Sequence, residues 1–201
     1  MIGPLAALLA VAAYGALHSL LAAPGAKRLA RRAFGQAGAR GYRLAYNAIG
    51  VVTLIPVLAV VALEPGAVLY RLRLPWAGLA LALQALALAV LALGLLQTDV
   101  MHFLGLRQLV EREAQPPRLV VSGLYRHVRH PLYTAGLAVL WFTPLLTASL
   151  LALNIAFTAY IVIGSHLEER RLHAEFGPAY AAYARRVPRL LPRLRPALNS
   201  D

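Results

Sequence analysis

The feature that most constrains this chain is a series of five apolar stretches, joined by links that carry nearly all of its charge. A run of about 20 apolar residues is what an α-helix needs to cross the hydrocarbon core of a bilayer. Hydrophobic residues make up 60% of the 201 residues and charged residues 14%, too few polar side chains to cover the surface of a soluble domain. The sequence therefore predicts an all-α integral membrane protein with five transmembrane helices. The stretches lie at about residues 2–22, 44–63, 75–96, 131–143 and 148–165.

The last two stretches are expected to form a tight helical hairpin. The fourth is short for a full span, and Pro144 leaves room for a tight turn before the fifth begins. The tail continues the fifth helix, breaks at Gly177-Pro178, and resumes as a short amphipathic helix that brings Tyr180 and Tyr183 near one another. No Lys or Arg precedes the first stretch, so we interpret it as a retained helix rather than a signal peptide.

The positive charges predict the orientation. With five spans, 18 of the 20 Lys and Arg residues fall on one side, in the links 23–43 and 97–130 and in the tail. The positive-inside rule makes that side cytoplasmic, so the amino terminus is outside and the carboxyl terminus inside. The net charge of +12 thus reports topology and contact with anionic membrane lipids, and we expect no nucleic acid partner. The absence of cysteine excludes disulfides, thiolate metal sites and a cysteine nucleophile, and we expect no metal site.

A dense polar cluster precedes the fourth stretch. Arg129 and His130 stand just ahead of Pro131, which is well placed as the first residue of a helix. Free backbone N–H groups and the helix dipole favour an anion such as a carboxylate there. Tyr125 and Tyr133 add aromatic faces and hydroxyls. An ordinary interface belt of Arg and Tyr is the alternative interpretation.

A second cluster follows the fifth stretch and contains Glu168 and Glu169. Adjacent residues on a helix point about 100° apart, so one carboxylate can face the bundle while the other pairs with Arg171 or His173. A carboxylate facing an apolar bundle needs a cation or hydroxyl groups, such as a sulfonium or a ribose diol. A solvated helix end is the alternative here.

These motifs resemble the superfamily of isoprenylcysteine carboxyl methyltransferases and phospholipid methyltransferases. The resemblance rests on Arg-His-Pro-Leu-Tyr at 129–133, Glu-Glu at 168–169, and the segment 176–188. Within the superfamily, the segments 17–19, 102–108 and 141–144 look most like the methanethiol S-methyltransferases. The first two expected spans also resemble the NnrU proteins. The third span lacks the Gly-x-Gly pattern of the phosphatidylethanolamine enzymes.

The resemblance implies a membrane enzyme that uses S-adenosylmethionine, placed in a bacterial inner membrane with its active site facing the cytoplasm. The sequence shows no internal repeat or low-complexity linker, so we expect one domain over 1–201, with spans one to three in 1–96 and the cofactor-binding core in 97–201. The methyl acceptor is expected to be a small apolar thiol such as methanethiol; the alternatives are a lipid or a prenylated cysteine carboxylate. The expected cofactor contacts are Tyr125, Arg129, His130, Pro131, Tyr133, Glu168 and Glu169.

Transfer of a methyl group from a sulfonium requires orientation and a dry cavity more than a strong acid or base. An imidazole or guanidinium nearby would favour the thiolate form of the acceptor. We expect His102, Arg107 and His18 to serve in this role. A different class of function, a haem carrier ligated by His18 and His102, is also conceivable from the sequence, as is a membrane scaffold without a ligand.

Overall fold

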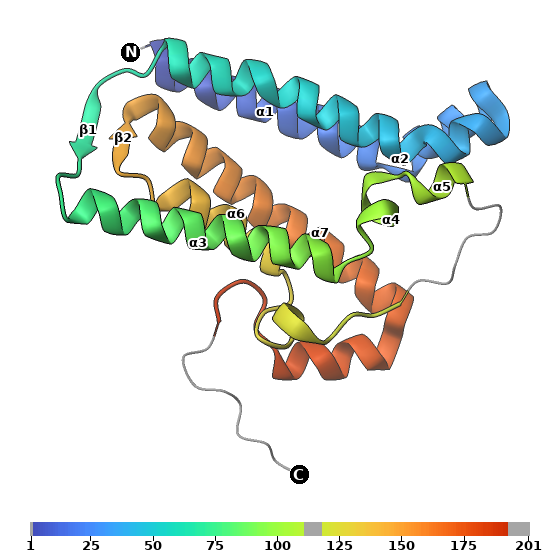
Figure 1. Ribbon diagram of the computed structural model, residues 1–201. Helices are drawn as coiled ribbons and strands as arrows, with labels where there is room; N and C mark the ends of the chain where they lie inside the picture. Colours follow the sequence, from blue (N-terminus) through green and yellow to red (C-terminus); the bar gives the residue numbers. More distant parts are fainter. Residues whose placement is uncertain (1, 111–117, 193–201) are drawn as a thin grey trace. The chain divides into compact units, whose positions relative to one another are not determined.

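The computed structural model describes residues 2–110 and 118–192, which are mostly helical (Figure 1). Arg112 and the tail arginines 193 and 195, which entered the charge count, lie outside these residues. The elements are α1 (Ile2–Ala22), α2 (Pro24–Leu63), β1 (Val68–Arg71), α3 (Trp76–Gln97), α4 (Val100–Leu104), α5 (Arg107–Val110), the 3-10 helix η1 (Gly123–Arg126), α6 (Pro131–Trp141), β2 (Leu145–Thr147) and α7 (Ala148–Arg186).

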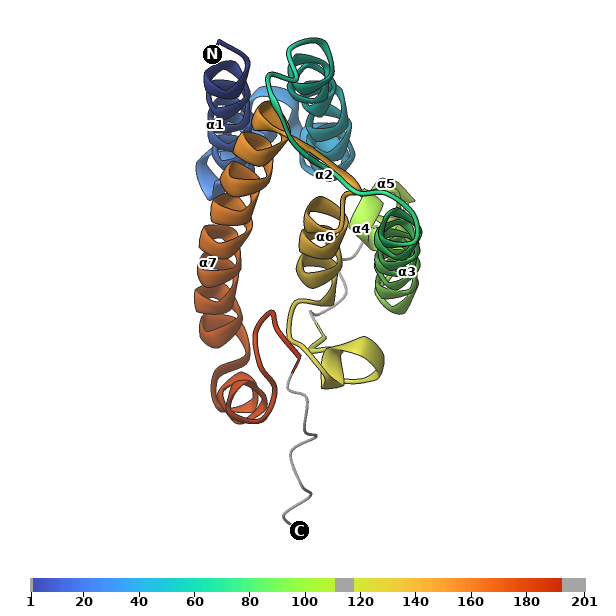
Figure 2. The same ribbon diagram turned by 90° about the vertical axis from the view of Figure 1, so that its left-hand side faces the viewer.

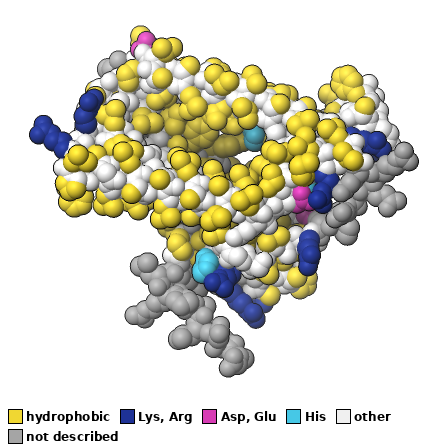
Figure 3. Space-filling view, viewed as in Figure 1, with side chains coloured by type: hydrophobic (Ala, Val, Ile, Leu, Met, Phe, Trp, Pro, Cys, Tyr) yellow, Lys and Arg dark blue, Asp and Glu magenta, His cyan; other side chains and the backbone are white. Residues whose placement is uncertain are grey.

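Among the described residues, four helices, α1, α2, α3 and α7, are long and apolar enough to cross a membrane. Their large hydrophobic side chains are widely exposed, for example Leu9 at 62% and Leu86 at 60%. Figure 3 shows hydrophobic side chains spread over the surface, with the Lys and Arg side chains gathered into a few groups. Such a surface is unfavourable in water and suits the interior of a bilayer, so the prediction of an integral membrane protein is confirmed.

The fourth expected span is the helix α6, which has 11 residues. At 1.5 Å per residue it extends about 16 Å, roughly half of the hydrocarbon core of a bilayer. The helix is therefore too short to span the bilayer alone, and five crossings and their orientation stay a prediction.

The described residues divide into two compact units, the first comprising residues 2–71, 99–110 and 145–157. In this unit α1 packs against α2. The buried residues of α1 are spaced four apart and are small, which lets the two backbones approach closely. They are Gly3, Ala7, Val11 and Gly15.

Two short strands in the first unit were not expected from the sequence. β1 pairs antiparallel with β2, and Arg71 stands opposite Leu145. The start of α7 is held beside them, because the Ser149 hydroxyl donates to the carbonyl of Glu64. The segment after Pro144 is thus a strand of this ribbon rather than a simple tight turn, because its backbone groups find partners in the link 64–74.

The second unit comprises residues 72–98, 118–144 and 158–192. Here α3 lies alongside α6, as both views of the ribbon show (Figures 1 and 2). Gly94 makes the close approach possible, because a Cβ atom there would lie 2.8 Å from Leu132 Cδ2. The Gln84 amide of α3 also donates to the carbonyl of Val139 in α6, 2.9 Å away.

Two long helices are interrupted by glycine. In α7 the backbone at Gly177 has φ 52° and ψ −126°, and Pro178 follows, so the predicted break is confirmed. In α2 the corresponding residue is Gly35, with φ 60° and ψ −141°. The sequence patterns assigned no element to the link 23–43, and the link is helical on both sides of Gly35. Pro24 at the first position of α2 and the abundance of Ala, Leu and Arg explain this.

Candidate functional site

The candidate site lies in the second unit, where η1 leads into the start of α6. Gly123 has φ 61°, and any Cβ atom there would collide with the side chain of Gln97. The Gln97 amide oxygen accepts from the backbone N–H of Leu124 at 2.9 Å, which fixes η1 against the end of α3. Past η1, His130 occupies the N-cap position and Pro131 is the first residue of α6, as predicted.

Arg129 and Glu169 form the central ion pair of the site. Nε and Nη2 of Arg129 each lie 2.7 Å from Glu169 Oε1, and the side chains are 11% and 16% exposed. Nη1 of Arg129 donates to the carbonyl of Ala184, 2.9 Å away, and to that of Val187. The guanidinium therefore uses all three nitrogens to join the start of α6, the middle of α7 and the end of α7.

Glu168 and Glu169 both turn toward the start of α6. The Tyr133 hydroxyl donates to Glu168 Oε2 at 2.9 Å, and His130 Nδ1 lies 3.7 Å from the same oxygen. The other ring nitrogen of His130, Nε2, lies 3.3 Å from Glu169 Oε1. The His130 side chain is 5% exposed and Glu168 is 45% exposed, so Glu168 is the acid that solvent or a ligand can reach.

The segment that follows α7 closes over this cluster, and we call residues 187–190 the strap. The backbone N–H of Arg129 donates to Pro188 at 2.9 Å, and that of His130 donates to Arg189 at 3.1 Å. The Thr134 hydroxyl donates to the Leu190 carbonyl at 2.6 Å. Two backbone hydrogen bonds and one side-chain hydrogen bond therefore hold the strap against the start of α6.

Two tyrosines after Gly177 connect the last part of α7 to η1. Tyr180 is 1% exposed, and its ring lies edge-on to Tyr183 with centroids 5.8 Å apart, as predicted. The Tyr183 hydroxyl donates to the Tyr125 carbonyl at 2.6 Å, which ties the helix after Gly177 to η1.

Burial and the nearby carboxylates shift the pKa values of His130 and Tyr125. Burial lowers the pKa of His130, and this outweighs Glu168 and Glu169, which act to raise it. Burial and the nearby Glu168 raise the pKa of Tyr125. At neutral pH the His130 imidazole and the Tyr125 phenol are therefore neutral, and Glu168 is the acid of the site that a ligand can reach.

All seven residues expected to contact the cofactor belong to this second unit, where the clusters from 125–133 and 168–169 meet. One detail differs from expectation. A carboxylate of the pair was expected to bind Arg171 or His173 within α7, and instead both find partners at the start of α6. Those partners are better because the carboxylates are partly buried there, whereas Arg171 and His173 are exposed.

His102 and Arg107, two of the expected catalytic residues, lie in the first unit on α4 and α5. Asp99 caps α4 by accepting from the His102 backbone N–H at 3.0 Å, and its other oxygen pairs with Arg107 at 2.6 Å. The His102 ring lies between two polar groups, with Nε2 3.1 Å from Arg43 Nη1 and Nδ1 3.2 Å from Gln108 Nε2. A guanidinium can only donate, so Nε2 of His102 accepts.

Arg43 and Asn47 of α2 hold α4 in place. Arg43 Nε donates to the carbonyl of Phe103, and the Asn47 amide donates to the carbonyls of Phe103 and Leu104. Gly105 then turns the chain with φ 91°, so close to α2 that a Cβ atom would lie 2.5 Å from the Leu44 nitrogen.

His18, the third expected catalytic residue, lies in the first unit on α1. Its Nδ1 is 2.9 Å from the Tyr46 hydroxyl of α2, and its ring stacks on Tyr14 with centroids 5.5 Å apart. These aromatic contacts make it part of the packing between α1 and α2.

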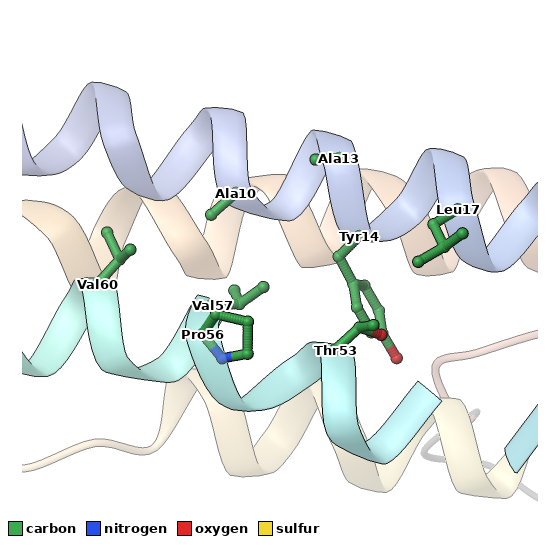
Figure 4. A pocket seen from close by; sticks show the side chains of 8 residues that line it. All are labelled: Ala10, Ala13, Tyr14, Leu17, Thr53, Pro56, Val57 and Val60. Atoms are coloured by element: carbon green, nitrogen blue, oxygen red, sulfur yellow. The ribbon is translucent and has the colours of Figure 1, made fainter. Parts of the chain in front are cut away.

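A pocket of about 290 Å³ also lies between α1 and α2 (Figure 4). Its lining is almost wholly apolar, so it has no groups that would hold a charged cofactor, and none of the expected site residues lines it. The lining residues are Ala10, Ala13, Tyr14, Leu17, Thr53, Pro56, Val57 and Val60.

Sequence reasoning did not single out several residues that build these arrangements. Gln97 and Thr134 shape the second unit, and Arg43 and Asn47 shape the first. Each is a polar residue at or beside an end of an apolar stretch, and that position is the signal that could have found them.

Comparison with known proteins places residues 74–178 in a family. Residues 74–178, just over half of the chain, match the family described as "Phospholipid methyltransferase". This range contains η1, α6 and both glutamates. No solved structure gives a significant match.

Curated relatives are similar over part of the chain. "Methanethiol S-methyltransferase 2" of Bradyrhizobium diazoefficiens is 49% identical over 78 residues, which are 39% of this chain and 30% of that protein. "Methanethiol S-methyltransferase" of Pseudomonas sp. (strain GM41(2012)) is 36% identical over 124 residues, which are 59% of this chain and 48% of that protein. The chain thus spans less than half the length of either relative. Because the family match covers more than half of its residues and contains the whole Arg129–Glu169 cluster, the chain belongs to the phospholipid methyltransferase family.

Proposed function

We propose that this protein is an S-adenosylmethionine-dependent membrane methyltransferase whose acceptor is a small apolar thiol such as methanethiol. The observation that carries the proposal is the cluster at the start of α6. Two acids of α7 meet Arg129, His130 and Tyr133 there, inside the range that matches the family. The names of the relatives support the choice of a thiol.

The residues of the second unit fit one end of such a cofactor. Glu168 is 45% exposed, and the hydrogen bond that it accepts within the described residues uses Oε2. Its carboxylate can therefore accept a hydrogen bond from a ribose hydroxyl or lie beside the positive charge of a sulfonium. The Tyr133 ring stacks on His130, with centroids 5.3 Å apart, and we propose that Tyr125 and Tyr133 form the aromatic side of the cofactor site. When bound, the cofactor supplies the electrophilic methyl group.

Arg129 and Glu169 would serve this site by a different route from Glu168. Both are nearly buried, and the anion at the start of α6 is the carboxylate of Glu169 itself. We propose that this pair contributes to cofactor binding by fixing α7 and the strap, so that Glu168 points outward. His130 would support Glu168 from the other side, and Pro131 fixes the first turn of α6.

In the first unit, His102 and Arg107 are proposed to favour the thiolate form of the acceptor, with His18 as a further candidate. The contacts of Arg43 and Gln108 hold the His102 ring in one orientation.

We also propose that the site faces the cytoplasm of a bacterial inner membrane. Two contacts within the first unit support the alternating topology. β1 pairs with β2, which joins the links 64–74 and 144–147, and Arg43 bonds to His102, which joins the links 23–43 and 97–130. Five alternating crossings require each of these pairs of links to share a side of the membrane.

The decisive experiment uses purified protein in nanodiscs and S-adenosylmethionine with a labelled methyl group. Methanethiol, a prenylated cysteine and phosphatidylethanolamine are offered separately, and labelled product is counted. We expect transfer to methanethiol, and its loss in Glu168→Gln. Glu175→Gln, an exposed acid on the same helix, is the matched control and should retain activity.

Other outcomes would redirect the proposal. Transfer to the prenylated cysteine or the phospholipid alone would keep the cofactor and replace the thiol. Failure to bind S-adenosylmethionine, measured by calorimetry, would refute the enzyme proposal, and a Soret band in the visible spectrum would then favour the haem carrier.

A further inference from the structure

The first part of α2, residues 24–34, is a separate helical segment that begins two residues after α1 ends and stops at Gly35. Its cations lie on one face. At about 100° per residue they cover an arc of roughly 140°, and the apolar side chains fall on the opposite arc. The cations are Lys27, Arg28, Arg31 and Arg32, and the apolar residues are Ala26, Leu29, Ala30, Ala33 and Phe34.

The apolar arc of this segment is exposed rather than packed. Leu29 is 67% exposed and Phe34 is 72% exposed. In a segment carrying four cations, large apolar side chains that face water lose the free energy that burial would provide. These side chains therefore require an apolar partner.

No described acid pairs with the cations of this segment. The sequence contains no Asp or Glu before Glu64, and the salt bridges found within residues 2–110 and 118–192 involve none of the four. Their positive charge is therefore available to an external anion.

The segment is also fixed in position by its neighbours along the chain. It follows directly from α1, an expected transmembrane helix, so it begins where that helix ends. After Gly35 the chain folds back closely, because a Cβ atom at Gly38 would lie 2.4 Å from the Ala30 carbonyl oxygen. A short helix at the end of a membrane span, basic on one face and apolar on the other, has the pattern of a helix that lies in the membrane interface.

We propose that residues 24–34 form an interfacial helix that binds anionic phospholipids, with the cations on lipid phosphates and Leu29 and Phe34 among the acyl chains. Zwitterionic headgroups balance each phosphate with an ammonium, so the four cations favour an anionic lipid over phosphatidylcholine. This inference stands apart from the proposed enzymatic function.

The absence of cysteine makes a direct test possible. Leu29→Cys and Arg31→Cys are spin-labelled in the full chain and reconstituted in nanodiscs of phosphatidylcholine, with and without phosphatidylglycerol. Collision rates with oxygen, which concentrates in lipid, and with a nickel chelate, which stays in water, are then measured. We expect the label at 29 to favour oxygen and the label at 31 to favour nickel.

The dependence on anionic lipid is tested with matched pairs of substitutions in the Leu29→Cys background. Phosphatidylglycerol should raise the ratio of oxygen to nickel collisions at 29 severalfold. Arg31→Gln with Arg32→Gln should abolish this rise, because each cation near an anionic surface contributes to binding. Arg185→Gln with Arg186→Gln removes two exposed cations of α7 and should leave the rise unchanged.

Three results would overturn the proposal. Equal nickel access at 29 and 31 would place the segment in water, as for an arm that binds a soluble polyanion. A label at 29 shielded from both reagents would indicate contact with a second protein copy. A rise that persists in Arg31→Gln with Arg32→Gln would show that lipid charge does not act through these cations.

Discussion

The strap provides the sharpest test of how the candidate site is held together. Arg129 is the side chain that joins the strap to both α6 and Glu169, and Arg129→Ala removes its bond to the strap carbonyl of Val187. A hydrogen bond to a charged group contributes about 1.5–3 kcal/mol when it is sheltered from water, and a weaker bond about 1 kcal/mol. With Arg129 11% exposed, we expect local opening of the strap to become easier by about 2–3 kcal/mol.

Hydrogen exchange reports this opening directly. The backbone N–H groups of residues 129 and 130 donate to the carbonyls of Pro188 and Arg189, so they exchange only when the strap leaves. A change of 1.4 kcal/mol is tenfold in an equilibrium constant, so exchange at 129 and 130 should accelerate by roughly 30- to 150-fold. Arg129→Lys keeps the positive charge but lacks the planar guanidinium. Exchange at 129 and 130 should therefore be faster than in the parent and slower than in Arg129→Ala.

Arg126→Ala is the matched control, because Arg126 is an exposed residue of the same segment whose Nε donates to His127. It should leave exchange at 129 and 130 within about twofold of the parent, as expected of exposed pairs. Acceleration of less than threefold in Arg129→Ala, or equal acceleration in Arg126→Ala, would refute the assignment of Arg129 as the residue that holds the strap.

Three further predictions concern single positions. Glu168→Gln should weaken S-adenosylmethionine binding at least about tenfold in calorimetry, with little change in melting temperature because this side chain is partly exposed; unchanged affinity would contradict its role. Because the folded-state pKa of His130 is lowered, the unfolded chain takes up a proton first as pH falls through about 6.5, and stability declines. Melting temperatures between pH 7.5 and 5.5 should therefore fall less in His130→Asn, and an equal fall would exclude His130 as the cause. Gly105→Ala should destabilise by more than about 1–3 kcal/mol, because φ is 91° and the new Cβ would meet α2, whereas Gly136→Ala, with no atom within 4 Å, should be neutral or stabilising.

Local sequence patterns were sufficient for much of the fold. Apolar runs of about 20 residues predicted α1, α3 and the membrane part of α7 to within a few residues, because the bilayer sets the length of a spanning helix. Pro131 marked the start of α6, and Gly177 with Pro178 marked the break in α7, because these residues restrict the backbone wherever they occur.

The two polar clusters were also visible in the sequence, and their residue types suggested a site. The sequence did not reveal which acid pairs with which base. Periodicity within α7 favoured partners three or four residues away, whereas Arg129, 40 residues distant, binds Glu169. Burial decides this, because a partly buried carboxylate gains more from a guanidinium that shares its shelter than from an exposed one on its own helix.

Two kinds of structure depended on contacts between distant segments. The ribbon of β1 and β2 forms because unpaired backbone groups of two separate links lie side by side, which no local pattern encodes. The basic link 23–43 is a helix in two parts, and its first part follows directly after α1. The structure thus shows which face of this helix carries the cations, which the number of charges alone did not. The sequence by itself thus determined that the chain enters the membrane and which residues are chemically capable. The tertiary structure decided which of those residues are buried as supports, such as Arg129, and which stay open to a ligand, such as Glu168, because burial is a property of the packed chain.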